Sequence, residues 1–248
     1  MPSQEDEDVR SYRTGKLKGE LVETVAYAPE QLLGVLNEVE QKYAPDTLYT
    51  AGDIGILRSG PRVSVVGSRK ASEDGLKRAR TLTKALLKRQ AVVVSGLAEG
   101  IDTAAHQTAI EFGGKTVAVL GTPLDRAFPI KNRSLQERLM RDFLVVSQFK
   151  TGYPTTPKSF PIRNRTMALL SDATVIVEAG EKSGTIHQGW EALRLGRPLF
   201  LMLSIVENSK LTWPADMIRY GAQVLERDIL GDFLALLPER AVGEEVAI

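Results

Sequence analysis

Six short apolar runs alternate with stretches of helical spacing over most of the chain. Successive residues in these runs are apolar, so each is expected to be a strand covered on both faces. Between several runs, apolar residues recur every three or four positions, which is typical of amphipathic helices. This alternation predicts an α/β fold with a doubly wound, mainly parallel sheet. The runs cover residues 63–68, 91–96, 116–121, 143–148, 174–179 and 198–203, and the helical stretches cover 76–87, 102–112 and 189–195.

The two ends of the chain and the region before the first run have a different pattern. The apolar spacing in residues 29–44 predicts one amphipathic helix, and residues 48–57 are expected to form a glycine-punctuated connection. Residues 228–237 are expected to form a last packing helix. The expected parts are a disordered acidic tail over residues 1–20, a small helical appendage over 21–60, an α/β domain over 61–240 and a tail over 241–248.

Composition narrows the range of functions. Hydrophobic residues make up 43% and charged residues 25% of the 248 residues, as in an ordinary globular domain. With 32 basic and 31 acidic residues the formal charge is +1, so any affinity for nucleic acid must come from local clusters of Lys and Arg. The absence of cysteine excludes disulfides and thiolate metal sites, and two histidines are too few for a histidine metal centre. No metal or cofactor is therefore expected.

Nothing in the sequence suggests export or insertion into a membrane. No apolar run approaches the roughly 20 residues that a membrane-spanning helix needs. The first ten residues, MPSQEDEDVR, are acidic and polar, unlike a secretory signal. A cytoplasmic protein without a membrane partner is therefore expected.

Candidate binding residues gather where the expected strands end. In doubly wound sheets, ligands bind outside the carboxyl ends of the strands, at a switch in strand order. After the first strand, Gly67-Ser68 would let the backbone approach a ligand, and Arg69-Lys70 offers cations to phosphate oxygens. Ser72 is expected to cap the next helix, whose N-terminus favours an anion. The alternative is an ordinary turn with two solvated cations.

The next two strands end in glycine turns. Ser95-Gly96 begins a segment with two glycines four positions apart, but the G-x-G-x-x-G spacing of a dinucleotide site is absent. Asp102 is expected to cap the following helix, and His106 is expected to pack or hydrogen-bond rather than to bind a metal. Gly121 ends the third strand and can contribute a backbone amide to the same rim.

The segment before the fifth strand has the most specific group of residues. It contains Lys158, Phe160, Arg163, Asn164 and Arg165. Consecutive helical residues turn by about 100°, so Arg163 and Arg165 lie about 200° apart and cannot both face one ligand. We expect Arg163 to face the groove. Phe160 is expected either to stack on a base, as aromatic residues do in single-strand binding, or to pack into the core.

The segment after the fifth strand opens a helix with small residues. Ser183, Gly184 and Thr185 place hydroxyl groups and free backbone amides at the same rim, which suits phosphate binding. The Gly-Lys-Ser/Thr order of a Walker loop is absent. A plain capped helix is the alternative.

Five motifs occur in an order that resembles the DNA-processing protein A family, also called DprA or Smf. The resemblance covers roughly residues 45–225. It implies an extended Rossmann fold that binds single-stranded DNA. It also implies a homodimer that protects incoming strands in natural transformation and helps to load a RecA-type recombinase. The motifs read VSVVGSRKAS, VVVSGLAEGIDTAAH, KTVAVLGTPLD, FPIRNRTMALLSD and VIVEAGEKSGT.

The resemblance also implies roles for individual residues. Ser68 and Arg69 would contact phosphate, and Ser183 and Gly184 would close the DNA groove. Its lining would consist of Lys158, Phe160, Arg163, Asn164 and Arg165.

The sequence departs from the family pattern in two places. Leu203-Ser204-Ile205-Val206-Glu207 replaces a usual Pro-Gly turn, and Ile186-His187-Gln188 replaces a usual Thr-Ala helix start. The chain also ends before the winged-helix domain that many members carry. A divergent, stand-alone member is therefore expected, and its pathway (transformation, recombination or phage defence) stays open.

Two other hypotheses use the same rim. Nucleotide phosphoribohydrolases of the lysine-decarboxylase-like group have an Arg four residues before a Met and a later Gly-Thr, as do Arg163, Met167 and Gly184-Thr185 here. That group has a glutamate where this chain has His187, which cannot stabilise an oxocarbenium-like state in the same way. The other hypothesis is a sensor that binds a nucleotide without turnover. We expect binding rather than catalysis.

Overall fold

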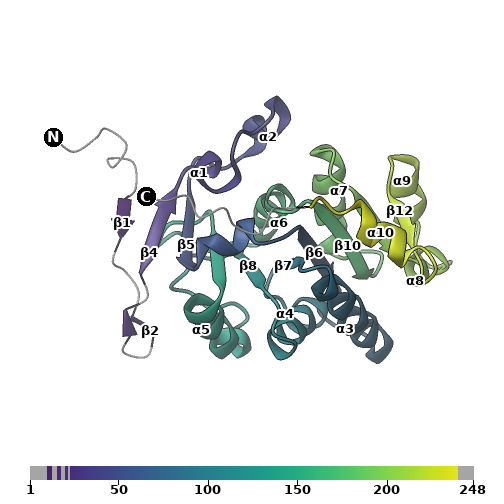
Figure 1. Cartoon of the computed structure of the whole chain (residues 1–248), viewed down its shortest axis with the longest axis horizontal. Helices are drawn as coiled ribbons and strands as arrows, with labels where there is room; N and C mark the ends of the chain where they lie inside the picture. Colours follow the sequence, from purple (N-terminus) through teal and green to yellow (C-terminus); the bar gives the residue numbers. More distant parts are fainter. Residues whose placement is uncertain (1–9, 13–15, 18–19, 22, 240–248) are drawn as a thin grey trace.

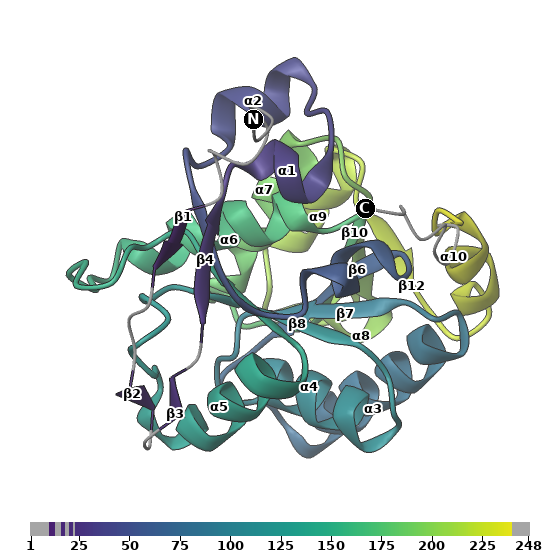
Figure 2. The ribbon, with the colours of Figure 1, turned by 60° about the vertical axis from the view of Figure 1, so that its left-hand side comes forward.

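The computed structural model describes residues 10–12, 16–17, 20–21 and 23–239. Within these residues, ten strands form one sheet in the order β1-β4-β5-β9-β8-β7-β6-β10-β11-β12. The strands from β9 to β12 in this order run parallel, and helices cover both faces of the sheet (Figures 1 and 2). The expected α/β fold with a doubly wound, mainly parallel sheet is confirmed. Most of the expected tail over residues 1–20 and the tail over 241–248 lie outside the described residues.

The parallel strands form at the six apolar runs. After β6 the sheet grows through β7, β8 and β9 on one side, and the chain then returns to add β10, β11 and β12 on the other side. The strand β12 was not expected, because three residues with one buried side chain leave too weak a pattern. The strands are β6 (Arg62–Gly67), β7 (Val92–Ser95), β8 (Thr116–Leu120), β9 (Leu144–Ser147), β10 (Ala173–Glu178), β11 (Leu199–Met202) and β12 (Gln223–Leu225).

Two groups of helices sandwich the sheet. The helices α3, α4 and α5 lie on one face, and α6, α7 and α9 lie on the other (Figure 2). Within the described residues, no helix is both long and apolar enough to cross a membrane. The helices are α3 (Glu73–Lys88), α4 (Ile101–Glu111), α5 (Arg133–Asp142), α6 (Ser159–Leu170), α7 (Thr185–Arg194), α8 (Leu203–Val206), α9 (Trp213–Arg219) and α10 (Leu230–Leu236), and the 3-10 helix η2 covers Ile130–Asn132.

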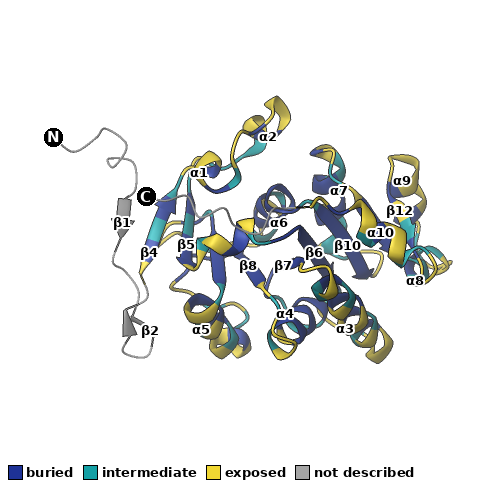
Figure 3. Ribbon diagram, viewed as in Figure 1, coloured by how far each residue is buried: buried dark blue, intermediate teal, exposed yellow. Residues whose placement is uncertain are grey.

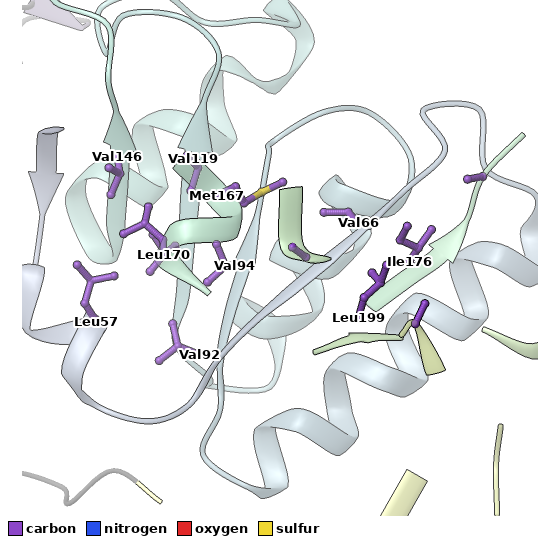
Figure 4. Close-up of a cluster of buried hydrophobic side chains, with 14 of the residues drawn as sticks. Leu57, Val66, Val92, Val94, Val119, Val146, Met167, Leu170, Ile176 and Leu199 are labelled. Atoms are coloured by element: carbon purple, nitrogen blue, oxygen red, sulfur yellow. The ribbon is translucent and has the colours of Figure 1, made fainter. Parts of the chain in front are cut away.

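The core lies on both faces of the parallel strands. Val66 and Val94 pack with Met167 of α6 on one face (Figure 4), whereas Val65 and Val93 pack against the face that α3 and α4 cover. Because neighbouring residues of one strand are buried on opposite faces, the central strands β6, β7 and β8 are dark blue in Figure 3, while the helices keep an exposed side. This double burial explains why the sequence shows continuous apolar runs rather than alternation.

The region before β6 differs from what the sequence predicts. Residues 48–57 are not a connection, because β5 (Leu48–Gly52) pairs antiparallel with β9. The strand β4 (Thr24–Tyr27) pairs in turn with β5, so this part of the expected helical appendage extends the sheet. Pairing satisfies the N–H and C=O groups of β9, a long-range requirement that local sequence does not reveal. The remaining elements here are β1 (Arg10–Tyr12), β2 (Lys16–Leu17), β3 (Glu20–Leu21) and the 3-10 helix η1 (Ile54–Arg58).

Residues 29–44 form two helices rather than the single expected helix. The first, α1 (Pro29–Leu33), ends at Gly34, which has a φ of 80°. The second, α2 (Glu38–Tyr43), begins after Asn37, whose Oδ1 accepts hydrogen bonds of 3.0 and 2.9 Å from two backbone N–H groups of the first turn. A left-handed glycine followed by an asparagine cap therefore ends one helix and starts another.

A buried ion pair joins the start of β6 to the residue before β10. The side chains of Arg62 and Asp172 are 4% and 7% exposed, and Nη2 of the arginine lies 3.0 Å from Oδ1 of the aspartate. The backbone N–H of Arg62 donates to the same carboxylate at 2.8 Å. Because β6 and β10 are the strands between which the strand order reverses, this pair fixes their relative position at the amino-terminal end of the sheet.

Replacing Asp172→Ala is expected to lower the free energy of unfolding by about 3–5 kcal/mol, because Arg62 stays buried without its counter-ion. The control is Asp216→Ala, which breaks the exposed Arg219–Asp216 pair and should cost less than about 1 kcal/mol. Urea denaturation followed by circular dichroism measures both. Small and equal losses in the two variants would contradict the role given to the buried pair.

Candidate functional site

A pocket opens at the carboxyl ends of the parallel strands, where the strand order reverses between β6 and β10. Its volume of about 540 Å³ lies in the usual range for ligand sites, roughly 300–1,000 Å³. The loop after β6, the start of α6 and the loop before α7 surround it, and we call it the switch-point pocket. The residues expected from the sequence that line it are Gly67, Ser68, Arg69, Lys70, Phe160, Arg163, Asn164, Ser183, Gly184 and Thr185.

The glycine turns are needed for packing within the protein. A Cβ atom on Gly67 would lie 2.6 Å from Cγ1 of Ile101 and 2.8 Å from the carbonyl oxygen of Glu178. A Cβ atom on Gly121 would lie 2.7 Å from Cδ1 of Phe160. These glycines therefore allow neighbouring protein atoms to approach closely. At Gly121, the closely approaching atoms belong to the ring of Phe160.

The N-terminus of α3 already holds an anion from the protein itself. Ser72 caps this helix as expected, and its Oγ accepts a hydrogen bond of 3.0 Å from the backbone N–H of Gly75. The carboxylate of Glu178 accepts hydrogen bonds from the backbone N–H and the hydroxyl of Ser72 at 2.9 and 2.5 Å. An external phosphate group therefore cannot use this helix start without displacing Glu178.

Arg163 lies in the floor of the switch-point pocket. Its side chain is largely buried, with the residue 6% exposed. Its Nη1 donates to the carbonyl oxygens of Gly96 and Val119 at 2.5 and 2.8 Å, and its Nε donates to Oδ1 of Asn164 at 3.0 Å. The guanidinium thus joins the carboxyl ends of β7 and β8 to α6, and it faces the pocket as the sequence predicts.

Asp102 is the buried carboxylate that accompanies Arg163. It does not cap α4, because Gly100 is the N-cap residue and the carboxylate instead accepts from the backbone N–H groups of Gly96 and Ala98 at 3.1 and 3.3 Å. Burial raises the pKa of Asp102, and the charge of Arg163 opposes this rise. Burial lowers the pKa of Arg163, which Asp102 opposes. Each charge therefore offsets part of the cost of burying the other.

Three cations surround the mouth of the pocket. Arg69 and Lys70 follow β6, Lys182 precedes α7, and all three are exposed. The guanidinium carbon of Arg69 lies 5.4 Å from the centre of the half-buried Phe160 ring, a cation–π contact. The sequence-based prediction missed Lys182, although its position beside Ser183 in the glycine-containing loop is a usable signal.

A further buried part of the pocket lining is apolar except for one amide, and we call it the deep end. Val66 and Met167 line it together with Gln188, which is 1% exposed. Neither Nε2 nor Oε1 of Gln188 has a hydrogen-bond partner among the described residues. Buried amides rarely lack partners, so this wall offers a donor and an acceptor to a polar ligand. The sequence-based prediction missed Gln188 as a site residue, because its lack of a partner depends on packing.

The other sequence-predicted site residues lie outside this lining. Arg165 donates to Glu191 at 3.3 Å and lies over the Tyr43 ring at 5.2 Å, on the side of α6 away from Arg163. Ser95 is buried and donates to a backbone carbonyl of β6 at 2.7 Å. Lys158 is exposed at the N-cap of α6.

The histidines and the remaining carboxylates near the pocket either have hydrogen-bond or ion-pair partners within the protein or lie outside the pocket lining. His187 is exposed and does not line the pocket. Like Glu178, Glu191 already has partners within the protein, because it forms ion pairs with Arg165 and with an arginine one turn further along α7. His106 hydrogen-bonds through Nδ1 to a threonine hydroxyl at 2.7 Å, as expected, and burial lowers its pKa to about 3. Within the described residues, no group of three or more His, Asp or Glu side chains could hold a metal ion.

The chain is similar in sequence to a known protein family. The family model described as DNA recombination-mediator protein A matches residues 25–233. The DNA processing protein DprA of Streptococcus pneumoniae is 36% identical over 192 residues, which cover 77% of this chain and 67% of that protein. Among the first curated relatives, the matched region covers between 52% and 67% of the relative's length.

Two solved structures have the same fold. The DNA processing protein A of Streptococcus pneumoniae superimposes with a TM-score of 0.73 and 32% identity, covering 86% of this chain and 74% of that chain. The DNA processing protein A of Helicobacter pylori, for which a single-stranded DNA binding mode is described, gives a TM-score of 0.70 and 26% identity. That match covers 83% of this chain and 90% of that chain.

Replacing Gly96→Ala is expected to displace the guanidinium of Arg163, because the added Cβ atom would lie 2.0 Å from its Nη1. The expected loss in the free energy of unfolding is about 1–3 kcal/mol. The control is Gly180→Ala, whose Cβ atom would have no neighbour within 4 Å. Thermal and urea denaturation of both variants test whether the close contact between Gly96 and Arg163 stabilises the fold. An unaltered stability of Gly96→Ala would show that Arg163 does not depend on this contact.

Proposed function

The chain belongs to the DNA recombination-mediator protein A family, and from this premise we propose that it binds single-stranded DNA at the switch-point pocket. The observation that carries the proposal is the arrangement of Arg69, Lys70 and Lys182 around the mouth of a recess whose lining includes Val66 and Met167. Phosphate groups suit the mouth and an unpaired base suits the recess. Since the net charge is only +1, this local cluster is the source of the affinity.

The start of α7 supports the phosphate part of this proposal. Gly184 is the N-cap residue and makes no side-chain cap, and a Cβ atom placed on it would meet nothing within 4 Å. Unlike the start of α3, where Glu178 is bound, this helix start has no hydrogen-bonded carboxylate among the described residues, and the Oγ of Ser183 accepts from the backbone N–H of Thr185 at 3.3 Å. Its dipole and the hydroxyl of Ser183 therefore favour an anion at the mouth, next to Lys182.

The deep end supports the base part of the proposal. A base is apolar on its faces and polar at its edge, which matches Val66 and Met167 around the amide of Gln188. The bases of a duplex are paired and stacked, so their edges and faces are not available to such a recess. The pocket therefore favours single strands over duplexes.

The two rival hypotheses receive less support from the site. Hydrolysis of a glycosidic bond needs a carboxylate that is available to the substrate. Asp102 lines the pocket, but its carboxylate accepts hydrogen bonds from the backbone N–H groups of Gly96 and Ala98. Glu178 and Glu191 already bind Ser72 and arginine side chains. A sensor that binds a free nucleotide would use the same cations and recess. Competition between a labelled strand and a nucleoside monophosphate distinguishes it from a DNA-binding protein.

Other parts of the proposal rest on the family resemblance alone. They are a homodimer, a RecA-type recombinase as partner, a cytoplasmic location, and a role in natural transformation or in a related recombination pathway. Because the chain covers about half to two thirds of the curated relatives, each of these needs its own test.

Fluorescence anisotropy with labelled single-stranded and duplex oligonucleotides at several salt concentrations tests the proposed function. We expect tighter, salt-sensitive binding of the single strand. Lys182→Ala should weaken it and reduce the slope of log K against log salt by about 0.7, the value for one phosphate contact on a single strand.

The control variant is Lys88→Ala, which removes an exposed cation at the far end of α3 and should leave binding unchanged. Arg163→Ala is a poor probe, because it also removes three hydrogen bonds of the pocket floor. Equal affinity for both DNA forms, or no binding at low salt, would contradict the proposed function.

A further inference from the structure

A second cleft adjoins the switch-point pocket on the other side of Phe160. Its volume of about 200 Å³ is less than half of the 540 Å³ of the switch-point pocket. It extends to Phe128 and Pro129, in the loop before η2, and we call it the side cleft. The two cavities share the lining residues Arg69, Lys70, Ala98, Phe160 and Arg163.

Phe128 presents an aromatic surface to the side cleft. The residue is 45% exposed, although a ring of this type is usually buried. Its centroid lies 5.1 Å from that of Phe160 at an interplanar angle of 43°, and Arg69 covers Phe160 at 5.4 Å. The three side chains form a contiguous group that runs from the mouth of the larger pocket into the smaller cleft.

We propose that the side cleft stacks a second base of the bound strand on Phe128, next to the nucleotide that the switch-point pocket holds. This inference rests on the proposed function and extends it. The phosphate that links the two nucleotides would lie at Arg69 and Lys70, because both cations line both cavities. Phe160 stands between the cavities and separates the two bases.

The size and the charge of the side cleft fit this occupant. A cavity of roughly 150 Å³ is enough to bind benzene, so about 200 Å³ admits a planar ring. The carboxylate of Glu99 also lines the cleft, but Lys131 lies 2.5 Å from it and offsets its charge. The cleft therefore combines an aromatic surface with a net positive surrounding, which is the combination that single-strand binding uses.

The test compares Phe128→Ala with Phe112→Ala. Phe112 is a matched control, because it is 49% exposed and has a lysine over its ring at 4.1 Å but lines neither cavity. Anisotropy is measured with an oligothymidine strand and with a strand of equal length whose nucleotides are all abasic. Phe128→Leu serves as a second variant that keeps the apolar volume and removes the aromatic ring.

We expect Phe128→Ala and Phe128→Leu to weaken binding of the oligothymidine strand about five-fold or more, which is the lower end of a lost base–aromatic stack. Binding of the abasic strand and the salt slope should not change, because the phosphate contacts remain. Phe112→Ala should bind both strands as the unaltered protein does. A strand with 2-aminopurine should lose part of its stacking-dependent quenching in Phe128→Ala.

Three results would overturn the inference. Oligothymidine binding that is unaltered in both Phe128 variants would show that no base stacks there. An equal loss on the abasic strand would show that Phe128 acts on the phosphate contacts, through Phe160 and Arg69. If either result is found while the unaltered protein binds single strands, the proposed function stands and only this inference fails. The third result is that the unaltered protein binds no single strand, in which case both the proposed function and this inference fail.

Discussion

The buried guanidinium of Arg163 is the interaction on which the pocket depends. A buried charge is costly unless it is paired and hydrogen-bonded, and this one bonds the carbonyl oxygens of Gly96 and Val119 and has Asp102 as its counter-charge. These partners stand at the carboxyl ends of β7 and β8 and at the start of α4. One side chain of α6 therefore sets how close that helix lies to the ends of two central strands. The requirement for glycine at position 96 and the buried position of Asp102 both follow from it.

The second constraint is which helix start is open to a ligand. In doubly wound proteins that bind dinucleotides, the helix after the first strand receives the pyrophosphate. Here Glu178, at the end of β10, takes that place at α3 through Ser72. Across the switch point, the start of α7 has no such carboxylate among the described residues, and its neighbour Lys182 is exposed. On the proposed function, the same sheet topology would direct an anion toward the β10 side, in keeping with the absence of a G-x-G-x-x-G motif after β6.

The sequence alone predicts the parallel strands and the rim at which the pocket lies, but not the details that depend on long-range packing. Apolar runs buried on both faces identify β6 to β11, and topology then brings the strand ends together at one rim. The strands β5 and β12 are missed because partners distant in the sequence stabilise them. Helix geometry shows that Arg163 and Arg165 cannot both face one ligand, but it does not reveal the partners of Arg165. These are Glu191 and Tyr43, and Tyr43 lies more than a hundred residues earlier in the chain. Phe128 is likewise uninformative until its contact with Phe160 is seen.

The contact at Tyr43 also changes how the N-terminal region relates to the pocket. The ring of Tyr43 lies 5.2 Å from the guanidinium carbons of both Arg165 and Arg194, on α6 and α7, and Glu40 pairs with Arg197 beyond the end of α7. The helix α2 therefore holds together the two helices that frame the pocket. Arg163 and Arg165 are two positions apart on α6, so a shift of this helix relative to α2 would move the guanidinium in the pocket floor as well. Because β5 also pairs with β9, residues before β6 are part of the same packed unit as the pocket rather than a separable appendage.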